Sequence, residues 1–230
     1  MVRAHSRRSL RSRSQLSDEV ADHVRELIMS GQVRAGEFLR LDKLAAELGV
    51  SVTPVREALA ALRGEDMVDL EPSRGYVVTP FSRQDIEDVF GLQADLAGEL
   101  AVRASARMPA EVLDELSELQ SALNRAVRSV DVAEVERAEF EFHRLINRTA
   151  DSRKLSWFLK NATRYLPQHF YSGDAGWRRT VRRDHNAILK ALRADDPEAV
   201  REPMVQHVTD GGRRLVKHLE KTGVWEPDAD

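Results

Sequence analysis

Apolar residues recur with a helical period through most of the chain. Near residue 50, two short helical stripes meet at a glycine, where the end of a helix favours a positive φ. Ser51 or Thr53 can cap the second helix, and Pro54 is tolerated in its first turn. The apolar positions are Leu41, Leu44, Ala45 and Leu48 before Gly49, and Val55, Leu59 and Leu62 after it. The pattern predicts a helix-turn-helix, with an ordinary helical hairpin as the alternative.

The flanking residues decide between these two interpretations. Two β-prone runs follow the second helix, on either side of the turn-forming segment Pro72–Gly75, and predict a hairpin. Before the motif, residues 17–30 carry a helical stripe that begins after a capping Ser17. Three helices followed by a hairpin form a winged helix-turn-helix, a fold class that binds DNA.

In this fold the N-terminal end of the second helix of the motif enters the major groove. We therefore expect a DNA-binding surface there, in which Arg56 reads bases because a guanidinium can bond a guanine at two atoms. The tip of the hairpin suits the minor groove or a phosphate, although a plain turn would look the same. The predicted DNA-binding residues are Ser51, Val52, Thr53, Arg56, Arg74 and Gly75.

From residue 83 onward the periodicity is helical, and breaks at residues such as Pro109 divide it into about six helices of about 15–25 residues. Short connections make neighbouring helices antiparallel, so we predict an all-α antiparallel helical bundle. Leu92, Trp157 and Phe158 are among the residues expected in its core.

Composition narrows the class of protein. The 230 residues suffice for two domains that each bury a core. The absence of cysteine excludes disulfides and thiolate metal sites, and no apolar run approaches the length of a membrane span. We expect a cytoplasmic protein that does not enter membranes. The net charge of −3 argues against a protein that coats nucleic acid, and the arginines of the first 15 residues suggest a disordered basic arm.

The histidines carry the chemistry of the helical half. Glu139 and His143 are four residues apart on one helix and project from the same face. His185 and His207 lie on apolar stripes of two later helices, so both point inward. Three histidines and a carboxylate predict a site for a divalent metal, zinc first, with nickel or manganese also suitable. Any one of these histidines alone would more often be a core residue with a polar partner.

The N-terminal residues resemble a known family. The segment Gly49–Leu59 (GVSVTPVREAL), with the preceding helix and the connection Gly31–Leu39, is similar to the DNA-binding domain of GntR-superfamily bacterial transcription regulators. The resemblance covers about residues 16–80. The family usually has arginine where this chain has Val52.

The histidine pattern also resembles the FadR-type effector domain of that superfamily, the FCD domain. The resemblance implies that Glu139, His143, His185 and His207 bind a metal, with an organic acid or similar effector nearby. The family commonly has aspartate in place of Glu139, and an arginine in place of Gln93 on the first helix. Gln93, Asn186 and Arg148 are the predicted effector-binding residues.

The predicted domains are a disordered basic arm (1–15), the winged helix-turn-helix (16–80), a linker (81–84), the FCD-type effector-binding and dimerisation domain (85–222) and a tail (223–230).

These patterns favour a DNA-binding transcription regulator, which we expect to be a homodimeric repressor on a palindromic operator, controlled by a small-molecule effector. A regulator for which the metal itself is the effector is the alternative. A metal-dependent hydrolase is a third interpretation, but no residue is clearly placed as its general base. An enzyme would also leave the DNA-binding winged helix-turn-helix unexplained. We therefore expect no enzymatic activity.

Overall fold

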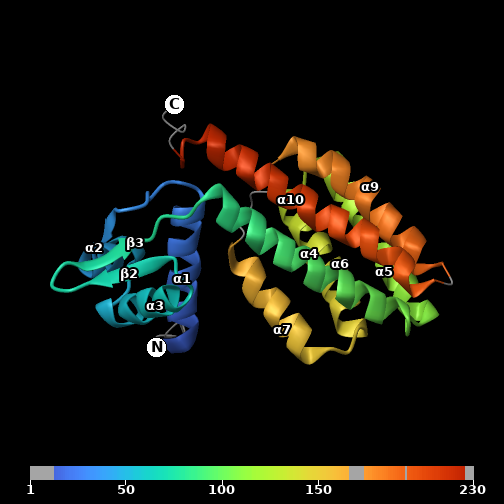
Figure 1. Cartoon of the computed structure of the whole chain (residues 1–230), viewed down its shortest axis with the longest axis horizontal. Helices are drawn as coiled ribbons and strands as arrows, with labels where there is room; N and C mark the ends of the chain where they lie inside the picture. The colour runs from blue at the N-terminus through green and yellow to red at the C-terminus, as the bar shows by residue number, and fades with distance from the viewer. Residues whose placement is uncertain (1–12, 166–173, 195, 226–230) are drawn as a thin grey trace, which may run out of the picture. The chain divides into compact units, whose positions relative to one another are not determined.

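The computed structural model describes residues 13–165, 174–194 and 196–225. The chain divides into two compact units, Met1–Phe81 and Ser82–Asp230. The first is a small winged helix-turn-helix and the second an all-α bundle, so the predicted fold class is confirmed (Figure 1). Most of the predicted basic arm, and residues 226–230 of the predicted tail, lie outside the described residues.

The first unit combines three helices with a small antiparallel sheet in the order β1-β3-β2. Phe38 of β1 and Asp69 of β2 both pair with Val77 of β3. The short strand β1 was not predicted, because two residues are too few for alternation to appear. The elements are α1 (Arg13–Met29), β1 (Phe38–Leu39), α2 (Leu41–Leu48), α3 (Val52–Gly64), β2 (Val68–Glu71) and β3 (Gly75–Val78).

The start of α1 differs from the prediction. The helix begins at Arg13, so Ser17 lies inside it and does not cap it. Arginine and glutamine favour helix, and Arg13 and Gln15 extend it toward the N-terminus. Residues 13–15 therefore belong to the helix and not to the predicted arm.

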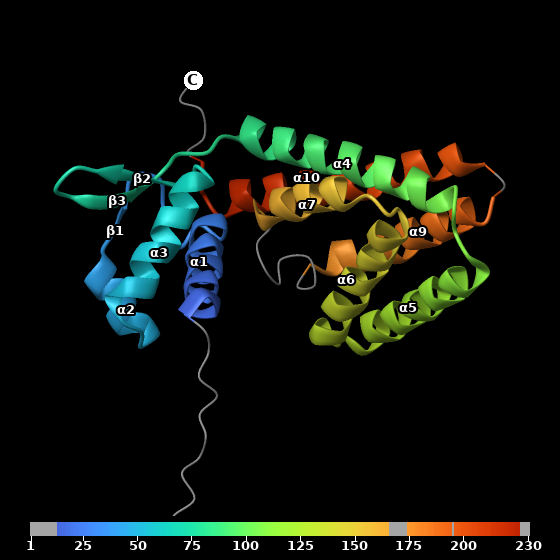
Figure 2. The same ribbon diagram turned by 90° about the horizontal axis from the view of Figure 1, so that it is seen from below.

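The second unit contains, in its described part, six α-helices and two 3₁₀ turns. They are α4 (Arg83–Ser105), α5 (Ala110–Ser129), α6 (Val132–Thr149), α7 (Arg153–Ala162), η1 (Thr163–Tyr165), α9 (Ala175–Leu192), η2 (Pro197–Val200) and α10 (Arg201–Lys221). Figures 1 and 2 show α4 and α10 side by side and α5 beside α6. Short connections impose this packing; Val130, for example, ends α5 with φ 57° and Asp131 caps α6.

The contact between α4 and α10 depends on a glycine. A Cβ added at Gly212 would lie 2.6 Å from Cγ of Phe90, well inside contact distance. At Gly98 an added Cβ would lie 3.0 Å from Val205. Because glycine has no side chain, the two longest helices of the unit, α4 and α10, can approach closely. This contact sets the position of α10, which carries His207, against α4.

Three apolar residues that were expected in the core are exposed, and this prediction is wrong. Leu92 is 55% exposed, Trp157 56% and Phe158 54%. Leu92 lies on α4, and the two aromatic residues lie on α7, which packs against α4. Helical periodicity identifies an apolar face but not what covers it. In a single chain these side chains form part of the surface.

Candidate nucleic-acid interface and candidate metal centre

The N-terminal end of α3 presents its polar residues to solvent. Gly49 adopts φ 65° and ends α2, as predicted, and Ser51 occupies the N-cap position of α3 without a side-chain cap bond. Ser51, Thr53 and Arg56 are exposed, and Val52 is half-buried. The exposed residues at 51, 53 and 56 lie within the first turn and a half of one helix, as a DNA-reading surface requires.

The opposite face of α3 is fixed in the core of the unit. Val55, Leu59 and Leu62 are fully buried, and α3 packs against α1. Arg25 of α1 adds an ion pair to Glu65, the residue that ends α3, with 2.8 Å between Nη2 and Oε2. The orientation of the exposed face is therefore set by the core of the winged helix.

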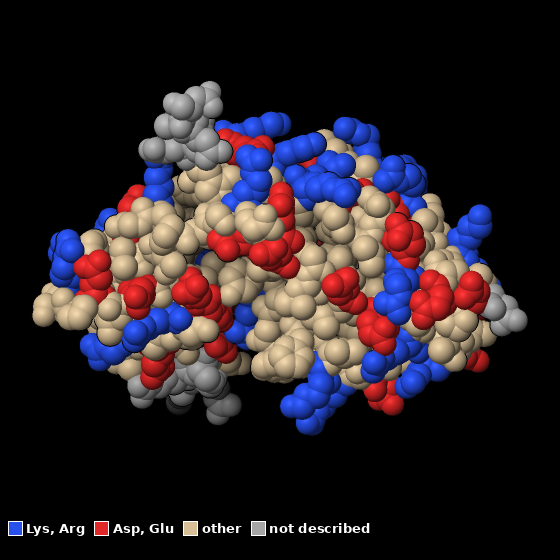
Figure 3. All heavy atoms as spheres, in the orientation of Figure 1, with Lys and Arg blue, Asp and Glu red and all other residues tan. Residues whose placement is uncertain are grey.

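The turn of the predicted hairpin lies between β2 and β3, at the residues predicted from the sequence. Arg74 and Gly75 lie at the turn between β2 and β3, and Gly75 adopts φ 105°. The Arg74 guanidinium stacks over the Phe38 ring, 4.5 Å from its centroid, and pairs with Glu71 at 2.9 Å. On the face drawn in Figure 3, acidic and basic side chains alternate over this unit, at the left of the view.

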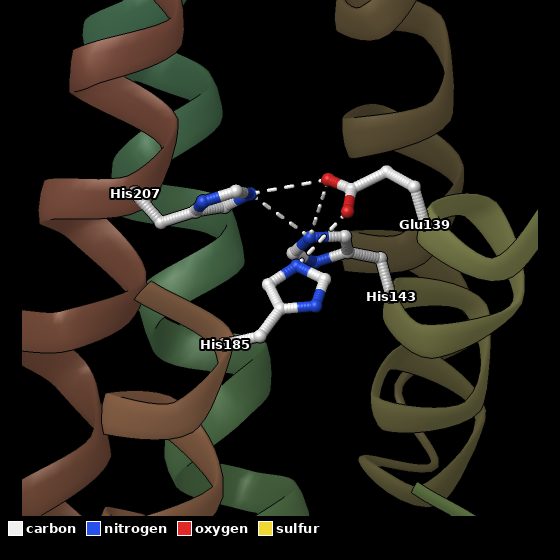
Figure 4. Close-up of side chains that lie close together, drawn as sticks. All are labelled: Glu139, His143, His185 and His207. Carbon is white, nitrogen blue, oxygen red and sulfur yellow. Dashed lines mark hydrogen bonds and ion pairs between the residues drawn. The ribbon is translucent and has the colours of Figure 1, made fainter. Parts of the chain in front are cut away.

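The bundle brings the four predicted metal ligands together. Glu139 and His143 come from α6, His185 from α9 and His207 from α10 (Figure 4). One donor atom from each lies within 4.8 Å of all the others. Oε1 of Glu139 is 3.2 Å from Nε2 of both His143 and His207, and those two nitrogens are 3.1 Å apart. Oε2 of Glu139 is 3.0 Å from Nε2 of His185.

The cluster is buried on one side and open on the other. His185 is fully buried and its ring stacks on Phe142, with 4.0 Å between centroids, while His207 is 8% exposed. The side chains of Glu139 and His143 are 20% and 24% exposed, so solvent reaches the cluster from α6.

The electrostatics of the cluster separate its histidines. Burial lowers the pKa of His185 to about 4, so its ring is neutral at neutral pH. Burial would also lower the pKa of His207, but Asp184 and Glu139 raise it to about 9. Burial would raise the pKa of Glu139, but the neighbouring His185 and His143 hold it well below the usual value of 4.5. The site thus stabilises a carboxylate and favours positive charge beside it.

The residues fit a divalent metal ion. Zinc binds imidazole nitrogen and carboxylate oxygen at about 2.0–2.2 Å in a tetrahedral arrangement, so donors around one ion lie about 3.4 Å apart. Oε2 of Glu139 and Nε2 of His185 are both buried without a hydrogen-bond partner. A buried polar atom left in this way costs about 1–3 kcal/mol, and a cation bound between the two would satisfy both. Three imidazoles and one carboxylate suit zinc, nickel or manganese.

Two buried polar residues beside the cluster were missed from the sequence. Gln120 of α5 is 3.0 Å from Nδ1 of His185, and Asp184 of α9 is 3.7 Å from Nδ1 of His207. Gln120 occupies a position between Leu116 and Leu123 on the apolar face of its helix. A polar residue on an apolar stripe was the available signal, because such a residue needs a buried partner.

The three predicted effector-binding residues lie in different surroundings. Gln93 is 2% exposed and its amide donates to the carbonyl of Ala162. Asn186 and Arg148 are exposed, on α9 and α6. Their contact with an effector stays a prediction.

A winged helix-turn-helix followed by a helical bundle is typical of DNA-binding transcription regulators with a second, helical domain. Family comparison identifies the two parts. Residues 16–78 match the bacterial regulatory proteins of the gntR family, and residues 88–210 match the FCD domain. The chain belongs to the GntR family of transcription regulators with an FCD domain, and it is not an enzyme.

Individual relatives agree with this assignment. The HTH-type transcriptional regulator YdhC of Bacillus subtilis is 23% identical over 88% of this chain and 91% of its own length. The gluconate operon transcriptional repressor of Bacillus licheniformis is 29% identical over 60% of this chain and 56% of its own length. The solved structure of Escherichia coli McbR/YncC has the same fold, with a TM-score of 0.67 at 22% identity, over 88% of this chain and 97% of that one.

In the described residues, none of the helices has the length and hydropathy that crossing a bilayer requires.

Proposed function

We propose that this regulator is a homodimeric repressor whose operator affinity is controlled by a small organic acid bound at a zinc ion in the helical bundle. The observation that carries the proposal is the convergence of Glu139, His143, His185 and His207 from three helices, with their donor atoms within 4.8 Å of one another. These residues would hold the ion, which when bound supplies a Lewis-acidic position for a carboxylate ligand. Glu139 and His143 leave the open side through which a small acid would enter.

The DNA half of the proposal rests on the exposed end of α3. Arg56 would contact a base edge, and Ser51, Val52 and Thr53 would contact neighbouring bases and phosphates. Arg74 and Gly75 would contact the backbone or the minor groove from the wing. Arg74 must then leave Glu71 and Phe38, so its contribution would be smaller than that of Arg56.

The homodimer is proposed from an exposed apolar surface. Leu92 of α4 and the two aromatic residues of α7 are each more than half exposed, the rings of Trp157 and Phe158 are in contact with 5.0 Å between centroids, and α7 packs on α4. Contiguous exposed apolar groups often mark a protein interface. Two copies joined through this surface would present two reading helices. On a palindromic operator the half-sites would be about one helical turn, roughly 34 Å, apart.

Control of DNA binding would pass through α10 and α4. His207 lies on α10, and five residues further along the same helix Gly212 packs against Phe90 of α4. Helix α4 follows the winged helix directly in the chain and begins with a capping box at Ser82 and Asp85. A ligand that prefers one setting of α10 would therefore favour one setting of α4, and reciprocally DNA would favour one state of the site. Repression is proposed by analogy with the gluconate operon repressor of Bacillus licheniformis.

The experiment begins with metal analysis of the tag-free protein and of its His143→Ala variant. About one zinc per chain in the wild type and a loss of most of it in the variant are expected. Nickel or manganese at the same occupancy would correct the identity of the metal and keep the site. No metal in a folded wild type, even after incubation with all three ions, would overturn the site.

A second measurement distinguishes control of DNA binding by an organic acid from control by the metal ion itself. DNA fragments selected from a random library serve as the operator, and binding is followed by fluorescence anisotropy with zinc-loaded and chelator-treated protein, with and without a panel of small organic acids. An acid that weakens binding only to the zinc-loaded protein supports the proposal. Binding that follows zinc alone, unaffected by every acid, would favour a metal-responsive regulator.

A further inference from the structure

We propose that Gln120 is a positioning residue that fixes the tautomer of His185, so that Nε2 of this histidine presents its lone pair to the ligand cluster. This inference rests on the proposed metal-binding function of that cluster. Gln120 belongs to α5, a helix that contributes none of the four candidate ligands.

The His185 ring has little freedom in the bundle. It is fully buried and lies almost parallel to the Phe142 ring, with an interplanar angle of 12°. Its Nδ1 is 3.0 Å from Oε1 of Gln120, which is itself 3% exposed. The hydrogen bond between these two side chains is therefore shielded from water. The proton can be on either ring nitrogen, so the tautomer depends on which end of the Gln120 amide faces the ring.

The neighbours of Gln120 determine that orientation. An arginine can only donate, and Nε of Arg182 donates to Oδ1 of Asn124 at 2.8 Å, which fixes the oxygen of Asn124. The amide nitrogen of Gln120 donates to this same oxygen at 3.4 Å and to the backbone carbonyl of Arg182 at 3.3 Å. Both partners are acceptors, so the nitrogen must face them and the Gln120 oxygen must face His185.

The tautomer of His185 follows from this network. Because Gln120 offers an acceptor, Nδ1 of His185 carries the proton and donates it, and Nε2 of the neutral ring is left as an acceptor. That Nε2 lies 3.0 Å from Oε2 of Glu139, which is also buried without a hydrogen-bond partner. Two buried acceptors that face each other form a site for a cation and not for a neutral hydrogen bond.

His207 has no hydrogen bond to its Nδ1 like the one that Gln120 makes to His185. Its Nδ1 faces Oδ2 of Asp184 at 3.7 Å, too far for a hydrogen bond, while Oδ1 of Asp184 pairs with Arg183 at 2.9 Å. The second imidazole of the cluster is therefore less strictly oriented. Among the described residues, Gln120 is the one whose hydrogen bond fixes a candidate ligand through a fully assigned chain of donors and acceptors.

The test uses the full chain and two readouts. Side-chain ¹⁵N NMR reports the tautomer of His185, assigned with the His185→Gln variant, and competition with a chelator of known affinity reports zinc binding. The variants are Gln120→Met, which removes the acceptor, and Gln120→Glu, which keeps one. Gln84→Met, at an exposed glutamine of α4, is the control for the substitution itself.

In the wild type we expect His185 protonated on Nδ1, with or without zinc. Gln120→Met should weaken zinc binding about 10- to 100-fold and mix the tautomers of His185, since outer partners of metal ligands contribute on this scale. Gln120→Glu should stay within a few-fold of the wild type and keep the Nδ1 proton, and Gln84→Met should change neither readout.

Two results would overturn the inference. One is a proton on Nε2 of His185 in the metal-free wild type, a measurement that needs no variant and so survives misfolding of Gln120→Met. The other is a folded Gln120→Met protein that binds zinc as tightly as the wild type. A wild type that binds no metal while His185 carries its proton on Nδ1 would instead overturn the proposed metal site and, with it, the role of Gln120 toward that site.

Discussion

Arg25 of α1 and Glu65 at the end of α3, forty residues apart in the sequence, form a buried ion pair with two nitrogens on one carboxylate. Nη2 and Nε of Arg25 lie 2.8 Å and 3.1 Å from Oε2 of Glu65. Arg25 is 7% exposed, so the pair is shielded from solvent and positions the proposed reading helix on its support.

Glu65→Gln should therefore destabilise the winged helix. Removal of one charge leaves the buried Arg25 with only its neighbour Asp22, and the expected cost is about 3 kcal/mol. Glu47→Gln is the matched control, because Glu47 faces Lys43 in an exposed pair that contributes less than about 1 kcal/mol. Urea unfolding measures both variants, and equal stabilities would show that the buried pair contributes no more than the exposed one.

Arg56→Ala should weaken specific operator binding by about 5- to 150-fold and leave the fold intact. The side chain is exposed, so its loss removes DNA contacts and little packing. A guanidinium that bonds a base at two atoms contributes about 1–3 kcal/mol of discrimination. Arg63→Ala, at the other end of α3, is the control. Anisotropy titrations on operator and scrambled DNA measure both variants, and wild-type affinity of Arg56→Ala would contradict the assignment of the reading helix.

Gly212→Ala should destabilise the bundle by about 1–3 kcal/mol, because the new Cβ would overlap the Phe90 ring. Gly91→Ala on α4 is a matched control: its Cβ would meet open space, and alanine favours helix by up to about 1 kcal/mol. Chemical unfolding should thus give effects of opposite sign. If Gly212→Ala left the free energy of unfolding unchanged, α4 and α10 could move apart without loss of stability.

The sequence predicted the fold class and the two helices of the reading motif because period, glycine and proline are local signals. Glu139 and His143 could be paired because four residues make one helical turn. The exposure of Trp157 and Phe158 could not be predicted, since periodicity does not reveal whether another surface covers an apolar face. The bond of Gln120 to His185 also escaped prediction, because it joins residues 65 positions apart through the packing of two helices.

Removal of metal should lower the stability of the helical unit. If zinc is held at the cluster, chelation leaves Glu139 Oε2 and His185 Nε2 without partners and withdraws the binding free energy from the folded state. Calorimetry with and without a strong chelator should show a fall of several degrees in the melting temperature of the wild type. The His185→Ala and His207→Ala variants should lose the metal and the response to chelator together. Full metal occupancy in both variants would reject the site.

The capping box of α4 predicts a pH dependence. Hydrogen bonds from the backbone and side chain of Ser82 lower the pKa of Asp85 below its ordinary 3.8. A lowered folded-state pKa stabilises the protein above the unfolded value, and this stabilisation is lost as the pH falls through the folded value. Asp85→Asn should therefore lower the melting temperature at pH 7, and the difference should shrink near pH 3.

Asp95→Asn, at an exposed carboxylate inside α4, is the control for this substitution and should behave like the wild type at both pH values. A difference between wild type and Asp85→Asn that is the same at both pH values would show that ionisation of Asp85 does not contribute to the cap.

The four candidate ligands are spread along the chain, with Glu139 and His207 separated by 68 residues. A single metal ion bound to all of them would be a reversible cross-link that closes long chain loops at once, and loop-closure entropy grows with loop length. Helix α6 supplies the first two donors by itself, but the loops would close only when α9 and α10 have docked. An ion held at the proposed site would therefore be bound late in folding, and its occupancy would report that the bundle is complete.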